Sequence, residues 1–208
     1  MKLKKSALLA AVMALCLLCG CGQKQEAEAT KETEPETAAA EQKVTAYADI
    51  AIRDYGTITV ALCGETAPVT VENFIALAED GFYDGLTFHR IMEGFMMQGG
   101  VPNGNGSGGS DQTITGEFAA NGIENPLSHT RGAISMARAK PFDSASSQFF
   151  IVHEDSTFLD GQYAAFGYVT EGMDVVDQVC KEAKPVDNNG TIPAEAQPVI
   201  ESITIREA

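Results

Sequence analysis

The sequence is short of positive charge. Its 208 residues include 14 lysines and arginines against 29 aspartates and glutamates, and the formal net charge is −15. Proteins that bind nucleic acids neutralise phosphates with clustered lysine and arginine, and polybasic segments likewise hold proteins on anionic membranes. The composition therefore argues against a nucleic-acid partner and against a domain that lies flat on a membrane surface.

Beyond residue 21 the sequence has only two cysteines and three histidines, and their spacing gives no redox or metal-site pattern. Cys63 and Cys180 each lack a C-x-x-C neighbour, although they could pair with each other in an oxidising compartment. His89, His129 and His153 lie 40 and 24 residues apart, which is not the spacing of zinc ligands. We expect neither a metal nor a cofactor.

The sequence also lacks an apolar run of the about 20 residues that a membrane-spanning helix needs. A shorter run, residues 7–18, follows three lysines within the first five residues and ends in Leu18-Cys19-Gly20-Cys21. This layout is typical of a secretory signal, and its last four residues resemble the lipobox of bacterial lipoproteins. We predict a lipoprotein signal peptide at residues 1–20 and a lipidated Cys21, with simple cleavage as the alternative.

A polar segment follows the signal. Residues 22–43 contain six glutamates and three lysines but no large apolar residue, so they cannot bury enough surface to offset the entropy of ordering them. We predict that residues 21–43 form a lipidated cysteine and a disordered acidic tether. Two acyl chains on Cys21 would anchor the protein to the outer face of the cell membrane, in an extracytoplasmic location.

Residues 44–208 are long enough for one domain with a full core. Residues 47–53 and 57–62 alternate apolar and polar residues around an Asp-Tyr-Gly turn, which predicts a β-hairpin. Residues 200–205 alternate in the same way. Much of the chain between reads as short strands separated by glycine, asparagine and proline clusters.

Two helices interrupt these strands. The first helical pattern starts with Thr66 as the cap and Pro68 in the first turn, and it ends at Gly81. The second follows Gly172 and repeats apolar residues at helical spacing from Met173 onward. Many short strands with two helices indicate a closed barrel rather than an alternating α/β sheet.

Arg90 is a charged residue within one of three largely apolar stretches of the sequence. They are residues 87–91, which have strand character, residues 94–100, which place Phe-Met-Met between glycines, and residues 148–152. These stretches could form an apolar binding patch edged by the arginine and two glutamines. On spacing alone, ordinary core packing with Arg90 solvated at a strand end is favoured.

Five blocks resemble successive signatures of the cyclophilins. They are F-H-R-I-M-E-G-F-M-M-Q-G-G, G-A-I-S-M-A-R-A, S-S-Q-F-F-I, F-L-D-G and F-G-Y-V-T-E-G-M-D-V-V, in the family's order between about residue 48 and residue 205. The resemblance implies an all-β fold, a closed eight-stranded antiparallel β-barrel capped by two α-helices. It also implies a monomeric peptidyl-prolyl cis-trans isomerase domain at residues 44–208, acting on proline-containing unfolded or partly folded polypeptides.

By motif, the resemblance makes Arg90 the catalytic arginine. Apolar side chains would hold the substrate proline ring, and two glutamines with the backbone of residues 137 and 138 would hold the peptide. The substrate-binding residues that it implies are Phe95, Met96, Gln98, Ala137, Arg138, Gln148, Phe150, Phe158, Leu159 and Tyr163.

Three of these positions depart from the family pattern. Phe158 stands where tryptophan is usual, and the sequence has no tryptophan at all. Tyr163 stands where a histidine is frequent, and Arg138 where an asparagine is frequent. Phe158 lacks the N–H with which the family grips cyclosporin, so we expect weak cyclosporin binding with catalysis retained. The role of Tyr163 stays open.

A peptide-binding chaperone or a surface interaction module could use the same groove without catalysis. The intact Arg90 favours the enzyme, because a pure binder has no need of the arginine. We therefore expect an isomerase that assists the folding of extracytoplasmic proteins.

Overall fold

The computed structural model describes residues 43–208. The predicted signal peptide, Cys21 and all of the predicted tether except Lys43 lie outside the described residues. None of the described helices is long and apolar enough to cross a membrane.

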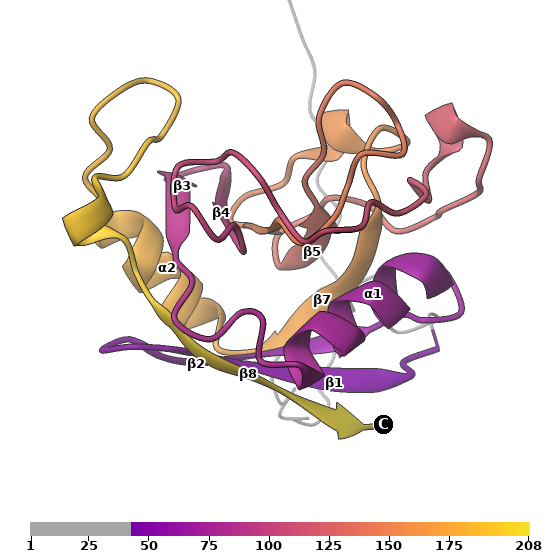
Figure 1. The fold of residues 1–208 in the computed structure, drawn as a ribbon, viewed down its shortest axis with the longest axis horizontal. Coiled ribbons are helices and arrows are strands. Elements are labelled where there is room, and N and C mark those ends of the chain that lie inside the picture. Colours follow the sequence, from indigo (N-terminus) through magenta and orange to yellow (C-terminus); the bar gives the residue numbers. More distant parts are fainter. Residues whose placement is uncertain (1–42) are drawn as a thin grey trace, which may run out of the picture. The chain divides into compact units, whose positions relative to one another are not determined.

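Eight strands form one antiparallel sheet, and two α-helices pack on it (Figure 1). Along the sheet the strands follow the order β3-β4-β6-β5-β7-β2-β1-β8, so the predicted all-β class with two helices is confirmed. The strands are β1 (Ala46–Ile52), β2 (Gly56–Leu62), β3 (Phe88–Met92), β4 (Met96–Gly99), β5 (Ala133–Met136), β6 (Phe149–Val152), β7 (Ala165–Glu171) and β8 (Ile200–Glu207). The helices are α1 (Pro68–Glu79) and α2 (Met173–Glu182), with 3-10 turns η2 (Ala119–Asn121), η3 (Thr157–Leu159) and η4 (Ala194–Ala196).

The two edge strands, β3 and β8, do not complete a barrel. Within residues 43–208 one isolated bridge joins the residues that directly precede the two strands, Thr87 and Val199. Residues 190–192 occupy the edge of β3 instead, through backbone hydrogen bonds of 2.8 and 2.9 Å. Gly190 permits this approach, because its φ is +85° and a Cβ would lie 2.5 Å from the Cγ of Met92. The predicted closed barrel is therefore wrong: the sheet is an open half-barrel whose free edge is covered by a loop.

The first hairpin forms where the alternating pattern predicts it. In β1, residues Ala48, Ile50 and Ile52 are buried, and the residues between them are half-buried. Ile50 lies opposite Ile58 of β2. The connecting turn places Asp54 at φ +67°, a conformation that aspartate tolerates better than most residues.

Helix α1 is capped from a distance rather than by the predicted Thr66. Its N-cap residue is Ala67, and Pro68 begins the helix. The carboxylate of Glu117 accepts hydrogen bonds from the backbone N–H of Val69 at 3.1 Å and of Thr70 at 2.8 Å. These donors have no partner inside the helix, so Glu117 supplies what a local cap would otherwise provide.

Strand β6 is buried on both of its faces, and this arrangement positions the site. Phe149 packs edge-on against Phe74 of α1 in the main core, with ring centroids 5.5 Å apart. Phe150, the next residue, points to the other face. There it joins a smaller buried cluster that contains Met96 and Val152.

The two cysteines of the described domain do not pair. Cys63 and Cys180 are both buried free thiols, and they belong to different apolar clusters. Burial raises the pKa of Cys180 to about 12, so this thiol stays protonated and unreactive at neutral pH.

Candidate active site

Arg90 lies on β3 directly opposite Gln98 of β4. Its Nη1 donates a hydrogen bond to Oε1 of Gln98 at 3.2 Å, and its Nε donates to the backbone carbonyl of Asn189 at 2.7 Å. The side chain is therefore fixed from two directions. Sequence spacing alone favoured a solvated arginine at a strand end, but this guanidinium is partly buried and hydrogen-bonded.

A chain of amide side chains continues from Arg90 along the surface. Nε2 of Gln98 donates to Oε1 of Gln148 at 3.1 Å. Nε2 of Gln148 in turn donates to the carbonyls of Gly106 and Gly108, at 3.1 and 3.0 Å. The loop at residues 104–109, which contains four glycines, is thus tied to the two glutamines, which lie 50 residues apart in the sequence.

The surroundings of Arg90 are largely apolar. Its Nη2 lies 3.4 Å from the sulfur of Met92, and its Cζ lies 5.8 Å from the ring centroid of Phe95. Burial lowers the pKa of Arg90 below its ordinary value, while the negative charge of Asp187 opposes that shift. An arginine keeps its proton in proteins, so the site presents a fixed, partly desolvated positive charge.

Beside Arg90 lies a cavity of about 160 Å³. Met96 and Phe150 are buried and form its floor, whereas Phe95, Leu159 and Tyr163 are half-buried and form its walls. The cavity is smaller than the about 300–1,000 Å³ typical of drug-sized ligands, so it suits one small apolar ring. Its lining residues are Arg90, Phe95, Met96, Gln98, Ala137, Arg138, Phe150, Leu159 and Tyr163.

All but two of the site residues predicted from the sequence therefore lie around one cavity. Gln148 lines a neighbouring cavity of about 350 Å³ together with Ala137 and Arg138. Phe158 is 71% exposed and lies at the rim, where its ring packs 5.6 Å from that of Phe95. A third cavity, of about 430 Å³, lies on the other side of Gln98 and reaches Asn189.

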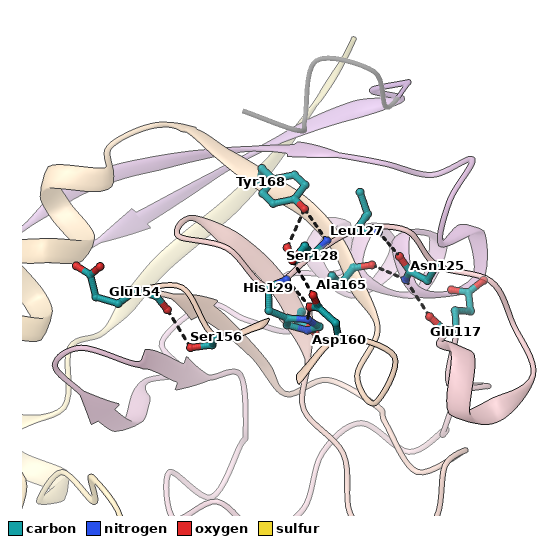
Figure 2. A network of polar contacts seen from close by, with 11 residues as sticks. Glu117, Asn125, Leu127, Ser128, His129, Glu154, Ser156, Asp160, Ala165 and Tyr168 are labelled. Atoms are coloured by element: carbon teal, nitrogen blue, oxygen red, sulfur yellow. Dashed lines mark hydrogen bonds and ion pairs between the residues drawn. The ribbon is translucent and has the colours of Figure 1, made fainter. Parts of the chain in front are cut away.

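Figure 2 shows a polar network around His129, and this network contacts the floor of the cavity through Phe150. Nδ1 of His129 lies 2.8 Å from Oδ1 of Asp160, and its Nε2 lies 2.9 Å from Oγ of Ser135. The imidazole ring stacks on Phe150 at 6.0 Å with an interplanar angle of 17°. Burial lowers the pKa of His129, although Asp160 opposes the shift.

The side chains of Ser135, His129 and Asp160 are hydrogen-bonded one to the next, as in the Ser-His-Asp triad of a hydrolase. These residues cannot serve as such a triad. Ser135 and His129 are both 0% exposed, so a substrate cannot reach the hydroxyl. The network instead ties η3, which carries Leu159, to the segment at His129. Spacing gave no signal for it, because His129 and Asp160 are 31 residues apart.

Residues 43–208 contain no group of three or more histidine, cysteine, aspartate or glutamate side chains placed to hold a metal ion. The side chains around the cavity provide an apolar ring pocket, a fixed cation and amide hydrogen-bonding groups.

A family model described as cyclophilin type peptidyl-prolyl cis-trans isomerase/CLD matches residues 47–207. Peptidyl-prolyl cis-trans isomerase B of Bacillus subtilis (strain 168) is 49% identical over 123 residues, which cover 59% of this chain and 82% of that protein. A peptidyl-prolyl cis-trans isomerase of Helicobacter pylori (strain J99) is 45% identical over 137 residues, which cover 65% of this chain and 81% of the relative.

A solved structure agrees with these sequence relatives. The crystal structure of a cyclophilin type isomerase of Cryptosporidium parvum, obtained in the presence of the dipeptide Ala-Pro, matches with a TM-score of 0.68 and 28% identity. The match covers 78% of this chain and 99% of that one. On the strength of the family match over residues 47–207, this chain belongs to the cyclophilin-type peptidyl-prolyl cis-trans isomerases and is an enzyme of that type.

Proposed function

We propose that Arg90 is the catalytic group of this isomerase and that the cavity of about 160 Å³ beside it holds the substrate proline ring. One observation carries the proposal: a partly buried guanidinium forms one side of an apolar cavity sized for a single ring. The cavity selects proline, and the guanidinium acts on the amide that precedes the ring.

The reaction makes modest chemical demands. Rotation about an X-Pro bond is slow because the amide loses its conjugation midway, over a barrier of about 18–20 kcal/mol. No covalent bond breaks, so no nucleophile or proton shuttle is needed. The enzyme must bind the twisted amide better than either planar form. A proline nitrogen becomes a good hydrogen-bond acceptor only when its lone pair is freed, and Arg90 can donate to it at that moment.

Arg90 does not act alone. A rate gain on the order of 10⁵ corresponds to roughly 7 kcal/mol, whereas one hydrogen bond to a charged group contributes about 1.5–3 kcal/mol. Phe95, Met96 and Phe150 exclude water and strengthen the interaction. Gln98, Gln148 and the backbone at residues 137 and 138 hold the flanking peptide while the bond turns.

We further propose that the enzyme acts outside the cytoplasm. A lipidated Cys21 would anchor it to the outer face of the membrane, and the acidic tether of residues 21–43 would separate the domain from the lipid. There it would assist the folding of proline-containing proteins. Mass spectrometry of the mature amino terminus tests this part: a diacylated Cys21 supports it, and an unmodified residue 1 overturns it.

A protease-coupled proline-isomerisation assay tests the catalytic assignment. We expect Arg90→Ala to lower kcat/KM by at least about 10²-fold, because both the charge and its donors are lost. Arg53→Ala is the matched control, since Arg53 lies in the β1–β2 turn and pairs with Glu201 on the surface. Equal rates for wild type and Arg90→Ala would overturn the assignment and favour a peptide-binding chaperone that uses the same groove.

A further inference from the structure

Two residues that depart from the usual cyclophilin pattern meet at the rim of the cavity. The Cζ atom of Arg138 lies 4.7 Å from the ring centroid of Tyr163. Both side chains line the same cavity as Arg90. Their contact links one departure from the pattern to the other.

Two further rings complete a cage around this guanidinium. The Cζ atom of Arg138 lies 5.0 Å from the ring of Phe118 and 5.1 Å from that of Phe142. Those two rings pack edge-to-face on each other at 5.4 Å. Aromatic faces attract a cation within about 6 Å, so three rings hold the guanidinium at once.

The N–H groups of the Arg138 guanidinium also donate hydrogen bonds. Its Nε donates to the carbonyl of Gln162 at 3.0 Å, and its Nη1 donates to the carbonyls of Ala139 and Lys140 at 3.0 and 3.4 Å. The side chain therefore joins the segment after β5 to the segment that carries Tyr163. A planar guanidinium can stack on rings while it donates in its own plane, whereas a lysine ammonium is a compact point charge without a plane that stacks.

Tyr163 depends on packing for its position. Within residues 43–208 its hydroxyl has no hydrogen-bond partner. Its ring packs edge-on against Phe150, the floor of the cavity, with centroids 6.0 Å apart and an interplanar angle of 84°. The guanidinium of Arg138 lies over the same ring at 4.7 Å, so the position of this wall depends on the caged guanidinium.

We propose that Arg138 is a positioning residue of this isomerase: it fixes Tyr163 as one wall of the proline pocket. The inference rests on the proposed function, because it takes the cavity beside Arg90 as the substrate site. Arg138 acts through Tyr163 on binding of the proline ring, whereas Arg90 acts on the twisted amide. Loss of Arg138 therefore affects KM far more than kcat.

The test measures kcat, KM and thermal stability of Arg138→Lys, Arg138→Ala, Tyr163→Ala and the double variant Arg138→Ala/Tyr163→Ala. We expect Arg138→Lys to raise KM for proline peptides by about three- to tenfold, with a much smaller change in kcat. The double variant should bind no worse than Tyr163→Ala alone, because residues that act through one another are not additive. Arg206→Lys is the control, since that guanidinium stacks 5.4 Å from Tyr47, on β1, and its KM should equal that of wild type.

Each result decides the question. Wild-type KM in Arg138→Lys, or additive KM effects in the double variant, overturns the proposal even if thermal stability falls. Arg138→Lys retains the charge and most of the side chain, so it answers the question if Arg138→Ala does not fold. A different result would overturn the proposed function, namely full activity of the Arg90→Ala variant.

Discussion

At the scale of single residues, the guanidinium of Arg90 uses its donors unequally. Nε and Nη1 donate to oxygen atoms, of Asn189 and Gln98 respectively. Nη2 contacts the sulfur of Met92 at 3.4 Å. A thioether sulfur is a weak acceptor. In the proposed mechanism, a substrate amide would therefore take over Nη2 at little cost while the other two hydrogen bonds hold the side chain.

The hydrogen bond from Nε depends on the loop that contains Asn189. The carboxylate of Asp187 accepts the N–H of Asn189 at 3.0 Å, and the N–H and hydroxyl of Thr191 at 3.0 and 2.9 Å. These hydrogen bonds, led by those of Thr191, lower the pKa of Asp187. Asp187 thereby shapes the loop that presents a carbonyl to Arg90.

We expect Asp187→Ala to lower kcat/KM by roughly three- to tenfold, because the loop loses the three hydrogen bonds that the carboxylate accepts and the Asn189 carbonyl can move. Asp187→Asn keeps an acceptor oxygen and should recover most of the loss. Steady-state kinetics at pH 7 checks both variants, with Asp111→Ala on an exposed loop as the control. Full activity in Asp187→Ala would contradict this role of the loop.

At the scale of elements, the turn between β3 and β4 brings Phe95 to the cavity. The N–H of Gly94 donates to Nδ1 of His153 at 2.9 Å, and the N–H of His153 donates to the carbonyl of Phe95 at 2.8 Å. Since Nδ1 accepts, the ring proton is on Nε2, which lies 3.2 Å from Asp177 of α2. Helix α2 thus supports the turn through one imidazole.

We expect His153→Leu to raise KM by roughly three- to tenfold and to lower Tm by about 2–4 °C, because the turn loses an acceptor of about 1 kcal/mol. Gln178→Leu, an exposed position on α2, is the control. Peptide kinetics and thermal unfolding measure both effects. An unchanged KM with a lowered Tm would mean that the turn does not need His153 to place Phe95.

At the scale of the whole molecule, histidines and carboxylates make the free energy of unfolding depend on pH in two different pH ranges. Burial, with a smaller effect of the Arg90 charge, lowers the pKa of His89 to about 4, and burial also lowers that of His129. Hydrogen bonds lower the pKa of Asp187 from 3.8, and the hydrogen bond of Arg206 does the same for Asp49. The unfolded chain therefore binds more protons than the folded one in both windows.

The histidine window lies between about pH 6.5 and pH 4. In this pH range His89 is protonated in the unfolded chain but stays neutral in the folded protein, where it is buried. The free energy of unfolding therefore falls as the pH drops, by about 2–3 kcal/mol for this residue. Protonation of the carboxylates lowers the free energy of unfolding further, but only below about pH 4. Urea unfolding from pH 7 to pH 4 measures the slope, and His89→Leu should flatten it. An equal slope in wild type and His89→Leu would contradict the prediction.

Local patterns predicted local structure well. The β1–β2 hairpin and helix α2 were foreseeable, because alternation and helical spacing involve neighbours in the sequence. Arg90, Phe95, Met96 and Gln98 fall within nine residues of one motif, so their convergence on a cavity followed from the resemblance. Phe158 belongs to a motif too, yet its ring lies at the rim, since η3 turns it outward.

Contacts between distant segments were not foreseeable. Glu117 caps α1 from 47 and 48 residues away, and the Asn189 carbonyl reaches Arg90 across 99 residues. No periodicity links such partners, because their proximity depends on how the sheet curves and where each loop crosses its edge. The sequence by itself determined the strands, the helices and the chemical types at the site. Only the tertiary structure decided that the half-barrel stays open, that Asn189 and His153 support the cavity, and that Arg138 stacks on Tyr163.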